Sequence, residues 1–443
     1  MLKANDAIEL AEHLYKVRQA ERDTLDEVRR YWKGRQKLPA VYDSKSGEVI
    51  KVLARSSRVN IIPIIINSVA QAMYVDGFRA NDGSDDIEVW NAWQANRMDR
   101  HQMGIHRATT AYGRSYVTVV PGDSAPVWKG YSPRQMTALY GEDPHWPDSA
   151  LSHEGHGSWR LWDEEAIYFL DGKEGKFTFT EARPHRAPVC PVIRHVDEED
   201  LDVDDEVSAQ SFLGEPDHLT IGQVGPYMAV QDQIDITTFG LKVAENAGAF
   251  RQRYAIGWVA ENEAEQLKAS AAKLWTIDED PSDVTIGEFG QTDLGGYIES
   301  REASLRHAAA LSQTPLPEFA TLIQMSADAL AAAYAGKERK IEERQTLAGE
   351  SHEQEFWLTG HYMGIDIPED AQVVWRETSA RSFASTVDGL GKLAQMLGVP
   401  PQELWEKIPG VTKSDVERWK AIAEQGDAFA QMEAMLTRQA QEV

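Results

Sequence analysis

The N-terminal region has the spacing of an amphipathic helix. Apolar side chains recur at helical intervals from Ile8 to Trp32, and Asn5 or Asp6 can cap the start of this pattern. Gly34 follows the last apolar position and can adopt the left-handed conformation that ends many helices. The pattern therefore predicts one long helix that ends near Gly34.

The next part of the chain alternates between helical and β patterns. Residues 58–75 are apolar without regular alternation, which predicts a buried helix. Residues 89–98 and 103–111 predict two short helices, and the β-branched and aromatic run 115–120 predicts a strand. Residues 121–196 contain short β-type pieces joined by Gly-containing turns, which predict a small antiparallel sheet.

A long helix is predicted to begin at Thr220. Thr220 and Gln223 have the spacing of a capping box, and apolar positions then recur at helical intervals to about Gly248. Residues 250–297 mix short β-type runs with Pro and Gly turns. We expect a helix, then a strand-and-turn region.

Helix patterns return in the last third of the chain. Residues 296–311 predict a helix that stops at the sequence TPLPEF, and residues 326–360 predict the longest helix, which would span roughly 50 Å. The run AQVVWRE predicts a strand, and residues 383–437 predict short helices. The chain is thus predicted to be α+β and helix-rich, with small sheets as inserts rather than alternating β-α units.

Charge and composition narrow the function. The chain has 443 residues, of which 42% are hydrophobic, and 71 acidic against 45 basic side chains give a net charge of −26. A protein that grips nucleic acid through its phosphates should be basic, so general DNA binding is disfavoured. Eight of the ten residues 197–206 are acidic, and we interpret this run as a solvated loop.

Cysteine usage and hydropathy exclude further classes. Cys190 is the only cysteine, which excludes an internal disulfide and any site with several cysteine ligands, and we interpret it as a buried structural thiol. The first ten residues contain Lys3, Asp6 and Glu9, so no apolar signal segment is expected there. No apolar run approaches the ~20 residues of a bilayer span, and we expect a soluble, non-secreted chain.

The motifs for nucleotide binding and nucleophilic catalysis are missing. The Gly-Lys pairs at 336–337 and 391–392 are followed by Glu338 and Leu393 rather than by the Ser or Thr of a phosphate loop. The sequence contains no Gly-x-Ser-x-Gly, the signature of a nucleophilic serine. Carboxylates are nevertheless so abundant that the sequence does not decide against a carboxylate-dependent hydrolase.

Two short patterns only partly match metal sites. His153 and His156 are three residues apart, whereas a zinc-binding helix needs a spacing of four, and we interpret them as loop histidines. The acidic run places carboxylates at the first three ligand positions of a calcium loop. However, Asp205 and Ser211 occupy the positions that require Gly and Glu. We therefore expect no metal and no cofactor.

Five segments, in this order, resemble one family. They are YWKGRQKLP, RVNIIPIIINSVAQAMYVDGF, VWNAWQANRMDRHQMGIHRATTAYGRSYVTVV, IGQVGPYMAVQDQIDITTFGLKVAENAGAFRQRYAIGW and VVWRETSARSFASTVDGLGKL. Their order over most of the chain resembles the portal proteins of long-tailed double-stranded DNA bacteriophages. The fourth segment is the most specific, with Gln-Asp near the middle of a helix, although it lacks the proline expected in its final turn.

The resemblance implies a ring-forming portal fold of about twelve subunits, each with wing, stem, clip and crown regions. Carried over by segment, the regions are: 1–219, the N-terminal wing; 220–248, the first stem helix; 250–292, the clip; 293–311, the second stem helix; 312–325, the tunnel loop; 326–382, the remaining wing; and 383–443, the crown.

The resemblance also implies which residues face the partners of a portal. The tunnel loop would contact DNA through Gln313, Thr314, Pro315, Leu316, Pro317 and Glu318. The clip would face the packaging motor, and later the connector, through Arg251, Arg253, Trp258, Lys268 and Lys273.

The expected function is therefore a virion protein at the portal vertex, assembled in the host cytoplasm, through which DNA is packaged and ejected. The implied partners are identical subunits, the terminase motor, the major capsid and scaffolding proteins, a head-completion connector and, transiently and without sequence preference, double-stranded DNA. No membrane, cofactor or catalytic activity is implied. A carboxylate-dependent hydrolase and an acidic protein-binding scaffold remain as alternatives.

Overall fold

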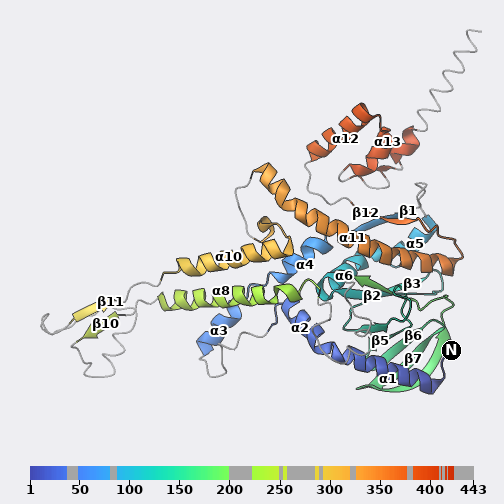
Figure 1. The fold of residues 1–443 in the computed structure, drawn as a ribbon, viewed down its shortest axis with the longest axis horizontal. Coiled ribbons are helices and arrows are strands. Elements are labelled where there is room, and N and C mark those ends of the chain that lie inside the picture. Colours follow the sequence, from blue (N-terminus) through green and yellow to red (C-terminus); the bar gives the residue numbers. More distant parts are fainter. Residues whose placement is uncertain are drawn as a thin grey trace, which may run out of the picture. The chain divides into compact units, whose positions relative to one another are not determined.

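The computed structural model describes residues 1–36, 48–79, 87–198, 222–248, 253–256, 285–288, 293–319, 326–376, 383–408, 411, 415–416 and 418–423. The chain divides into two compact units, Met1–Val374 and Trp375–Val443. Helices and small antiparallel sheets follow one another in an α+β arrangement, as predicted (Figure 1). None of the helices that the structure describes is both long and apolar enough to cross a membrane.

The first helix packs on a five-stranded antiparallel sheet. Helices α1 (Ala4–Ala20) and α2 (Arg22–Trp32) precede this sheet, whose strand order is β4-β5-β6-β7-β8. The strands are β4 Met136–Leu139, β5 Ser149–Gly155, β6 Ser158–Asp163, β7 Ala166–Lys173 and β8 Lys176–Pro184. Leu151, Leu161 and Tyr168 lie opposite one another on adjacent strands and are buried in one cluster with the apolar face of α1.

The second sheet has three strands in the order β3-β2-β9: β2 Arg114–Val120, β3 Val127–Tyr131 and β9 Val192–Val196. The interior of β2 is buried at five successive positions, which means that both faces of this strand are covered. Cys190 lies in the apolar cluster beside this sheet and is buried, and its burial raises the pKa of the thiol. The expectation of a buried structural thiol is confirmed.

Helices from several parts of the chain share one core. Four of the described helices follow the N-terminal helices in sequence and precede β2: α3 Glu48–Ser56, α4 Ile62–Ala70, α5 Ile87–Ala95 and α6 Met98–Tyr112. Ile62, Ile65 and Ile66 of α4 are buried with Val28 of α2 and Tyr112 of α6. The same cluster also contains Ile234 and Ala308, one from each of the two helices described next, so both helices pack into this core.

Two helices pack side by side and have a hairpin between them in sequence. After the 3₁₀ turn Gly225–Tyr227 come α8 (Met228–Gly248), β10 (Arg253–Ile256), β11 (Thr285–Glu288) and α10 (Gly295–Ser312) (Figure 1). A Cβ at Gly240 of α8 would lie 2.7 Å from the ring of Tyr297 on α10. Glycine at this position therefore allows the tyrosine ring to pack directly on the backbone of α8.

The longest helix, α11 (Ala327–Met363), crosses the first unit. The hydroxyl of Ser326 accepts the backbone N–H of Ala329 and caps its start, and Gly364 ends it with a φ of 71°. Phe356 of α11 stacks on Phe78 of β1 (Val75–Arg79), with 4.3 Å between the ring centroids. Strand β12 (Gln372–Trp375) then pairs with β1, so the segments before and after α11 are joined in one two-stranded sheet.

The second unit is small and helical. Its described elements are α12 (Phe383–Leu397), α13 (Pro401–Leu404) and the 3₁₀ turn Trp405–Lys407. Trp405 packs edge to face against Trp419 at 5.9 Å between ring centroids, which gives this unit an apolar contact of its own.

Several predicted element boundaries were wrong. The N-terminal helix is divided at Glu21, whose carboxylate is buried and pairs with Arg114 of β2. Gly34 does adopt the left-handed conformation, with a φ of 63°. The helix predicted over residues 58–75 covers only Ile62–Ala70, because Val75 already belongs to β1.

The predicted start of the helix at Thr220 is not supported. Thr220 lies outside the described residues, and the helical conformation begins at Gly225–Tyr227, where Pro226 occupies the first turn. The side-chain amide of Gln223 does not return to cap the helix. It binds Asp197 and Lys340, which come from other elements.

The stacked aromatic core under α11 generates a stability prediction. Phe356 is fully buried, so Phe356→Ala should lower the free energy of unfolding by about 3–5 kcal/mol through lost contacts and the cavity left behind. The adjacent Trp357 is 39% exposed, and Trp357→Ala is the matched control, with an expected loss of about 1 kcal/mol. Urea unfolding measures both, and equal losses would contradict the placement of Phe356 in the core.

Candidate functional site

The predicted clip residues are mostly outside the described part of the chain, as is the case for Arg251, Trp258, Lys268 and Lys273. Arg253 begins β10, where it lies opposite Glu288 of the antiparallel partner β11. The short strands predicted for this region are thus confirmed at β10 and β11. The assignment of residues 250–292 to a surface that faces the motor stays a prediction.

The predicted tunnel loop begins where α10 ends. We call residues 312–319 the channel segment, after the expected tunnel loop to which they belong. Gln313 terminates α10 in the left-handed conformation, with a φ of 52°, and a 3₁₀ turn follows at Leu316–Glu318. Pro315 and Pro317 interrupt the helix, as their missing N–H donors predict. Residues 320–325 lie outside the described residues.

The channel segment packs against α10 and α4 within the first unit. Thr314 is 3% exposed, its backbone N–H donates to the Ala309 carbonyl at 3.1 Å, and its hydroxyl lies 3.4 Å from that of Ser68 on α4. Pro315 is also buried, whereas Gln313 is exposed. In this arrangement Gln313 offers its side chain to solvent and Thr314 and Pro315 do not.

Two lysines of α11 hold the two ends of the channel segment. Lys337 pairs with the carboxylate of Glu318 at 2.6 Å, so the single charge of this segment is compensated. Lys340 donates to the backbone carbonyl of Ser312 at 3.1 Å and to the side-chain oxygen of Gln223 at 2.7 Å. Because these lysines are three residues apart, they project from the same face of the helix.

The start of the acidic run joins the same buried centre. Asp197 is only 2% exposed, and Gln223 donates to its carboxylate at 2.8 Å while Arg344 lies 3.4 Å from the same oxygen. Arg344 also contacts Glu198. The interpretation of this run as a solvated loop is therefore wrong at Asp197, because α11 supplies a buried cation for it; residues 199–206 lie outside the described residues.

Burial shifts the pKa values in this centre. Burial raises the pKa of Asp197, although Arg344 and the hydrogen bond from Gln223 oppose the shift. Burial lowers the pKa of Lys340 to about 8, although Asp197 opposes this shift. Each charge is thus retained in the interior mainly through its hydrogen bonds and its partner of opposite sign.

The Gln-Asp motif of the fourth family-like segment anchors α8 at its base. The side chain of Gln231 accepts the N–H of Ile61 at 2.9 Å and donates to the carbonyl of Val59 at 3.0 Å. Asp232 accepts the hydroxyl of Tyr31 at 2.9 Å, and Asp235 accepts the N–H of Val59 at 3.1 Å. Gln231 and Asp235 therefore bind backbone groups of Val59 and Ile61 just before α4, and Asp232 binds a side chain of α2.

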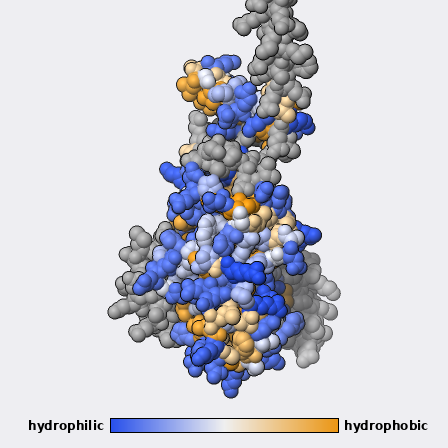
Figure 2. All heavy atoms as spheres, turned by 90° about the vertical axis from the view of Figure 1, so that its right-hand side faces the viewer, coloured by the Kyte–Doolittle hydropathy of each residue, from blue (hydrophilic) through white to orange (hydrophobic). Residues whose placement is uncertain are grey.

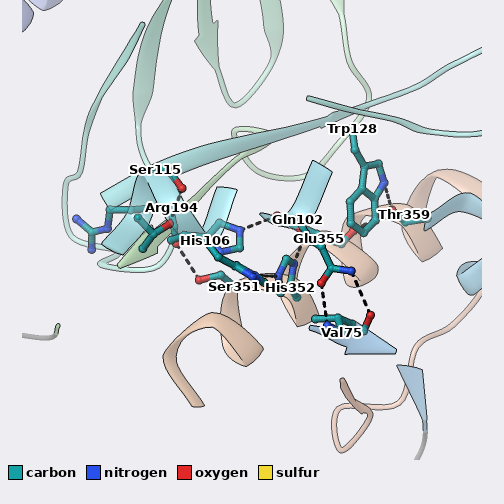
Figure 3. Close-up of polar contacts among 12 residues, drawn as sticks. Val75, Gln102, His106, Ser115, Trp128, Arg194, Ser351, His352, Glu355 and Thr359 are labelled. Carbon is teal, nitrogen blue, oxygen red and sulfur yellow. Dashed lines mark hydrogen bonds and ion pairs between the residues drawn. The ribbon is translucent and has the colours of Figure 1, made fainter. Parts of the chain in front are cut away.

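A second buried polar centre lies between α6, β9 and α11 (Figure 3). Nε2 of His195 lies 2.7 Å from one carboxylate oxygen of Glu355, and Nδ1 of His352 lies 2.7 Å from the other. Nε2 of His352 lies 3.0 Å from Nε2 of His106, whose Nδ1 lies 2.9 Å from the carbonyl of Met73. All four side chains are buried.

The carbonyl of Met73, at the end of this row of hydrogen bonds, fixes the positions of the protons. A carbonyl only accepts, so His106 carries its proton on Nδ1 and its Nε2 is an acceptor. Nε2 of His352 must then donate to it, and a further proton is shared between Nδ1 of His352 and Glu355. Burial raises the pKa of Glu355, but His352 and His195 outweigh it and lower the pKa to about 2.

Sequence reasoning missed this histidine centre. Its members are separated by up to 249 positions, from 106 to 355, and only the His352-x-x-Glu355 spacing on one helix could have suggested it. The histidines that the sequence did single out, His153 and His156, lie beside and in the β5–β6 turn, where His156 has a positive φ. The interpretation as a loop histidine is confirmed for His156 but is wrong for His153, which lies in β5 opposite Trp159 of β6 and packs against its ring.

Comparison with known proteins decides the family. A family model described as phage portal protein, SPP1 Gp6-like, matches residues 11–428. The chain belongs to the phage portal protein family. The portal proteins of Mycobacterium phages D29 and L5 are 23% and 22% identical over 390 and 389 residues, and each match covers 80% of this chain and 77% of the relative.

Solved structures with some likeness come from gene transfer agent particles. One is the neck of an empty particle, computed with C6 symmetry, which is 14% identical in sequence. The match covers 80% of this chain and 95% of the chain in that structure, with a TM-score of 0.46. Another is the neck of a native particle, computed with C12 symmetry, which is 15% identical in sequence. The match covers 84% of this chain and 93% of the chain in that structure, with a TM-score of 0.42.

Family membership confirms the function that the resemblance implied. The protein is the portal of a phage particle, the channel protein through which double-stranded DNA is packaged and ejected. The portal protein family is structural rather than enzymatic, and the match favours the portal function over the hydrolase alternative. The Gln-Asp motif thus has a physical role in this portal protein, since it holds the base of α8 to Ile61 and Tyr31 within the first unit.

The buried Lys340 generates a prediction about pH. The native state loses the Lys340 proton near pH 8, whereas the unfolded chain retains it to about pH 10.5, so the unfolded state binds more protons between these values. Stability should therefore rise with pH in this window. Relative to Lys340→Met, the wild-type free energy of unfolding should gain about 2 kcal/mol from pH 8 to pH 10.

Urea unfolding at several pH values measures this difference. Lys129→Met removes a half-exposed lysine and is the control for the loss of one positive charge. A wild-type-minus-Lys340→Met difference that stays flat from pH 7 to pH 10 would contradict the buried position of the ammonium group.

Proposed function

We propose that about twelve copies of this portal protein form a ring with α8 and α10 as stem helices around a DNA channel. The observation that carries the proposal is the helix pair itself. Both helices leave one common core, and a β-hairpin separates them in sequence. In a portal protein, this arrangement supports the assignment of the stem to α8 and α10 and of the clip to residues 250–292.

Exposed apolar side chains on the stem helices support assembly. Ile236 on α8 and Tyr297, Ile298 and Leu311 on α10 are all exposed in the single chain, Leu311 by 62%. Exposed large apolar side chains on a helix pair can be covered by contacts with other molecules. We therefore assign this surface to the neighbouring subunits of the ring.

The charge of the ring suits passage rather than binding. Each chain carries −26, so about twelve copies carry roughly −312, and this repels the phosphates of a duplex at short range. Within the channel segment the only charge, Glu318, is paired with Lys337. Contact of the exposed Gln313 with DNA would thus be polar and would release few counterions.

The energy for DNA movement has to come from a partner. The Gly336-Lys337 pair lacks the hydroxyl residue of a phosphate loop, and Lys337 is engaged with Glu318. We therefore assign ATP hydrolysis to a separate terminase motor that docks on the clip, where the connector binds later. Capsid and scaffolding proteins are assigned as partners of the wing.

Ring assembly should not require DNA. The purified protein is expected to sediment as a ring, far above its 49.5 kDa monomer mass, in analytical ultracentrifugation at moderate salt. Ile236→Asp should shift the protein toward monomer because it introduces a charge into an apolar contact, whereas Ile236→Val should assemble normally. A wild-type protein that remains monomeric at micromolar concentrations would overturn the proposal.

A positive charge at Gln313 should make the channel adhesive. Gln313→Lys adds one cation per subunit close to the passing duplex, so counterion release should slow packaging in vitro, and added salt should reverse the effect. Gln313→Asn, which adds no charge, is the control and should package at the wild-type rate. Equal packaging rates for both variants at low salt, in rings of normal size, would show that Gln313 does not face DNA.

A further inference from the structure

The buried histidine centre has the donor groups of a metal site. His195, His352 and Glu355 offer donor atoms that all lie within 4.8 Å of one another, and all three side chains are fully buried. His352 and Glu355 are three residues apart on α11, so both project to one side of the helix, and His195 reaches them from β9. Two imidazoles and a carboxylate are a donor set typical of Zn²⁺.

The surroundings orient these groups as metal ligands are oriented. The outer nitrogen of His352 donates to His106 (Figure 3). His106 in turn donates to the carbonyl of Met73. Such outer hydrogen bonds fix the tautomer and the ring orientation of metal-bound histidines. The ring of Trp93 packs against His352 with 5.5 Å between centroids, which adds an apolar wall.

One atom of the centre has no role in the hydrogen-bonded arrangement. Nδ1 of His195 is buried and has no hydrogen-bond partner among the described residues. A buried polar atom without a partner is rare and calls for an explanation. Because no neighbouring group requires Nδ1 to act as an acceptor, this nitrogen is available to carry the ring proton when Nε2 binds a cation.

We propose that this centre binds one divalent transition metal ion, with Zn²⁺ the best chemical match, through Nε2 of His195, Nδ1 of His352 and the carboxylate of Glu355. The ion replaces the proton shared by His352 and Glu355, so one proton is released per ion bound. The nitrogen–oxygen separations are 2.7 Å, and two tetrahedral Zn²⁺ ligands lie about 3.3 Å apart. Each of these two nitrogen–oxygen pairs therefore needs to separate by about 0.6 Å.

The bound ion would join parts of the wing that are distant in sequence. His195 lies 160 residues before Glu355, and His106 extends the connection to α6. Because such an ion holds β9 and α11 together only in the folded state, it stabilises that state by mass action. The proposal is independent of the ring proposal, since it concerns contacts within one chain.

The first test uses the wild-type protein. It is expressed without a histidine tag in medium with added Zn²⁺, or with Co²⁺ in place of Zn²⁺, and separated from loose metal by gel filtration. Elemental analysis should find about one ion per chain, and the Co²⁺ protein should show the visible absorption of nitrogen and oxygen ligands. Removal of the ion by unfolding in EDTA and refolding should lower the melting temperature, and refolding with Zn²⁺ should restore it.

The second test locates the ion. His195→Gln and Glu355→Gln should each lower the affinity for Zn²⁺ at least about tenfold. His361→Gln, which changes an exposed histidine of the same helix, should bind as the wild type does. If Glu355→Gln fails to fold, His195→Gln and the Co²⁺ spectrum of the wild type carry the test.

Two results would overturn the proposal. A wild-type protein refolded with Zn²⁺ that holds no stoichiometric metal and melts at the same temperature as the EDTA-treated protein would show that hydrogen bonds alone hold the centre. Equal metal content and unchanged affinity in His195→Gln would place the ion elsewhere in the chain.

Discussion

The polar face of α11 is the constraint on which the first unit depends. Lys340, Arg344 and His352 follow one another along this helix, and each contacts a different element: the end of α10, the start of the acidic run and α6. A buried charge that loses its partner costs several kcal/mol. A shift of α11 along its axis by one turn would break all of these contacts at once. The polar contacts therefore fix the position of α11 relative to the elements around it.

Local patterns were sufficient for the elements that their own residues determine. The longest helix was predicted over 326–360 and covers Ala327–Met363, because a serine cap, helical periodicity and a following glycine all lie within the segment itself. Strand β2 was visible from its β-branched run. The boundaries at Glu21 and Gly225 were missed because they depend on Arg114, Asp197 and Lys340, residues that come close only in the folded chain.

The candidate sites show the same division. The prolines of the channel segment predicted a break between two helices, and the break is present. The burial of Thr314 against Ser68 could not be predicted, since these residues are 246 positions apart. Likewise, an acidic run indicates solvent exposure by composition, and only the position of Arg344 in the fold shows why Asp197 is interior. The histidine centre combines three segments, so no single sequence motif encodes it.

The contact between Gly240 and Tyr297 has a geometric consequence. Because the tyrosine ring packs where a Cβ would lie, any larger residue at Gly240 has to displace this ring or move α8 and α10 apart. In the proposed ring, every subunit would carry the same displacement. If about 1 Å of a helix displacement lies along the circumference, the roughly twelve proposed subunits lengthen the circumference by ~12 Å and the diameter by ~4 Å. In that ring, the absence of a side chain at one position, repeated by symmetry, would contribute to the width of the channel.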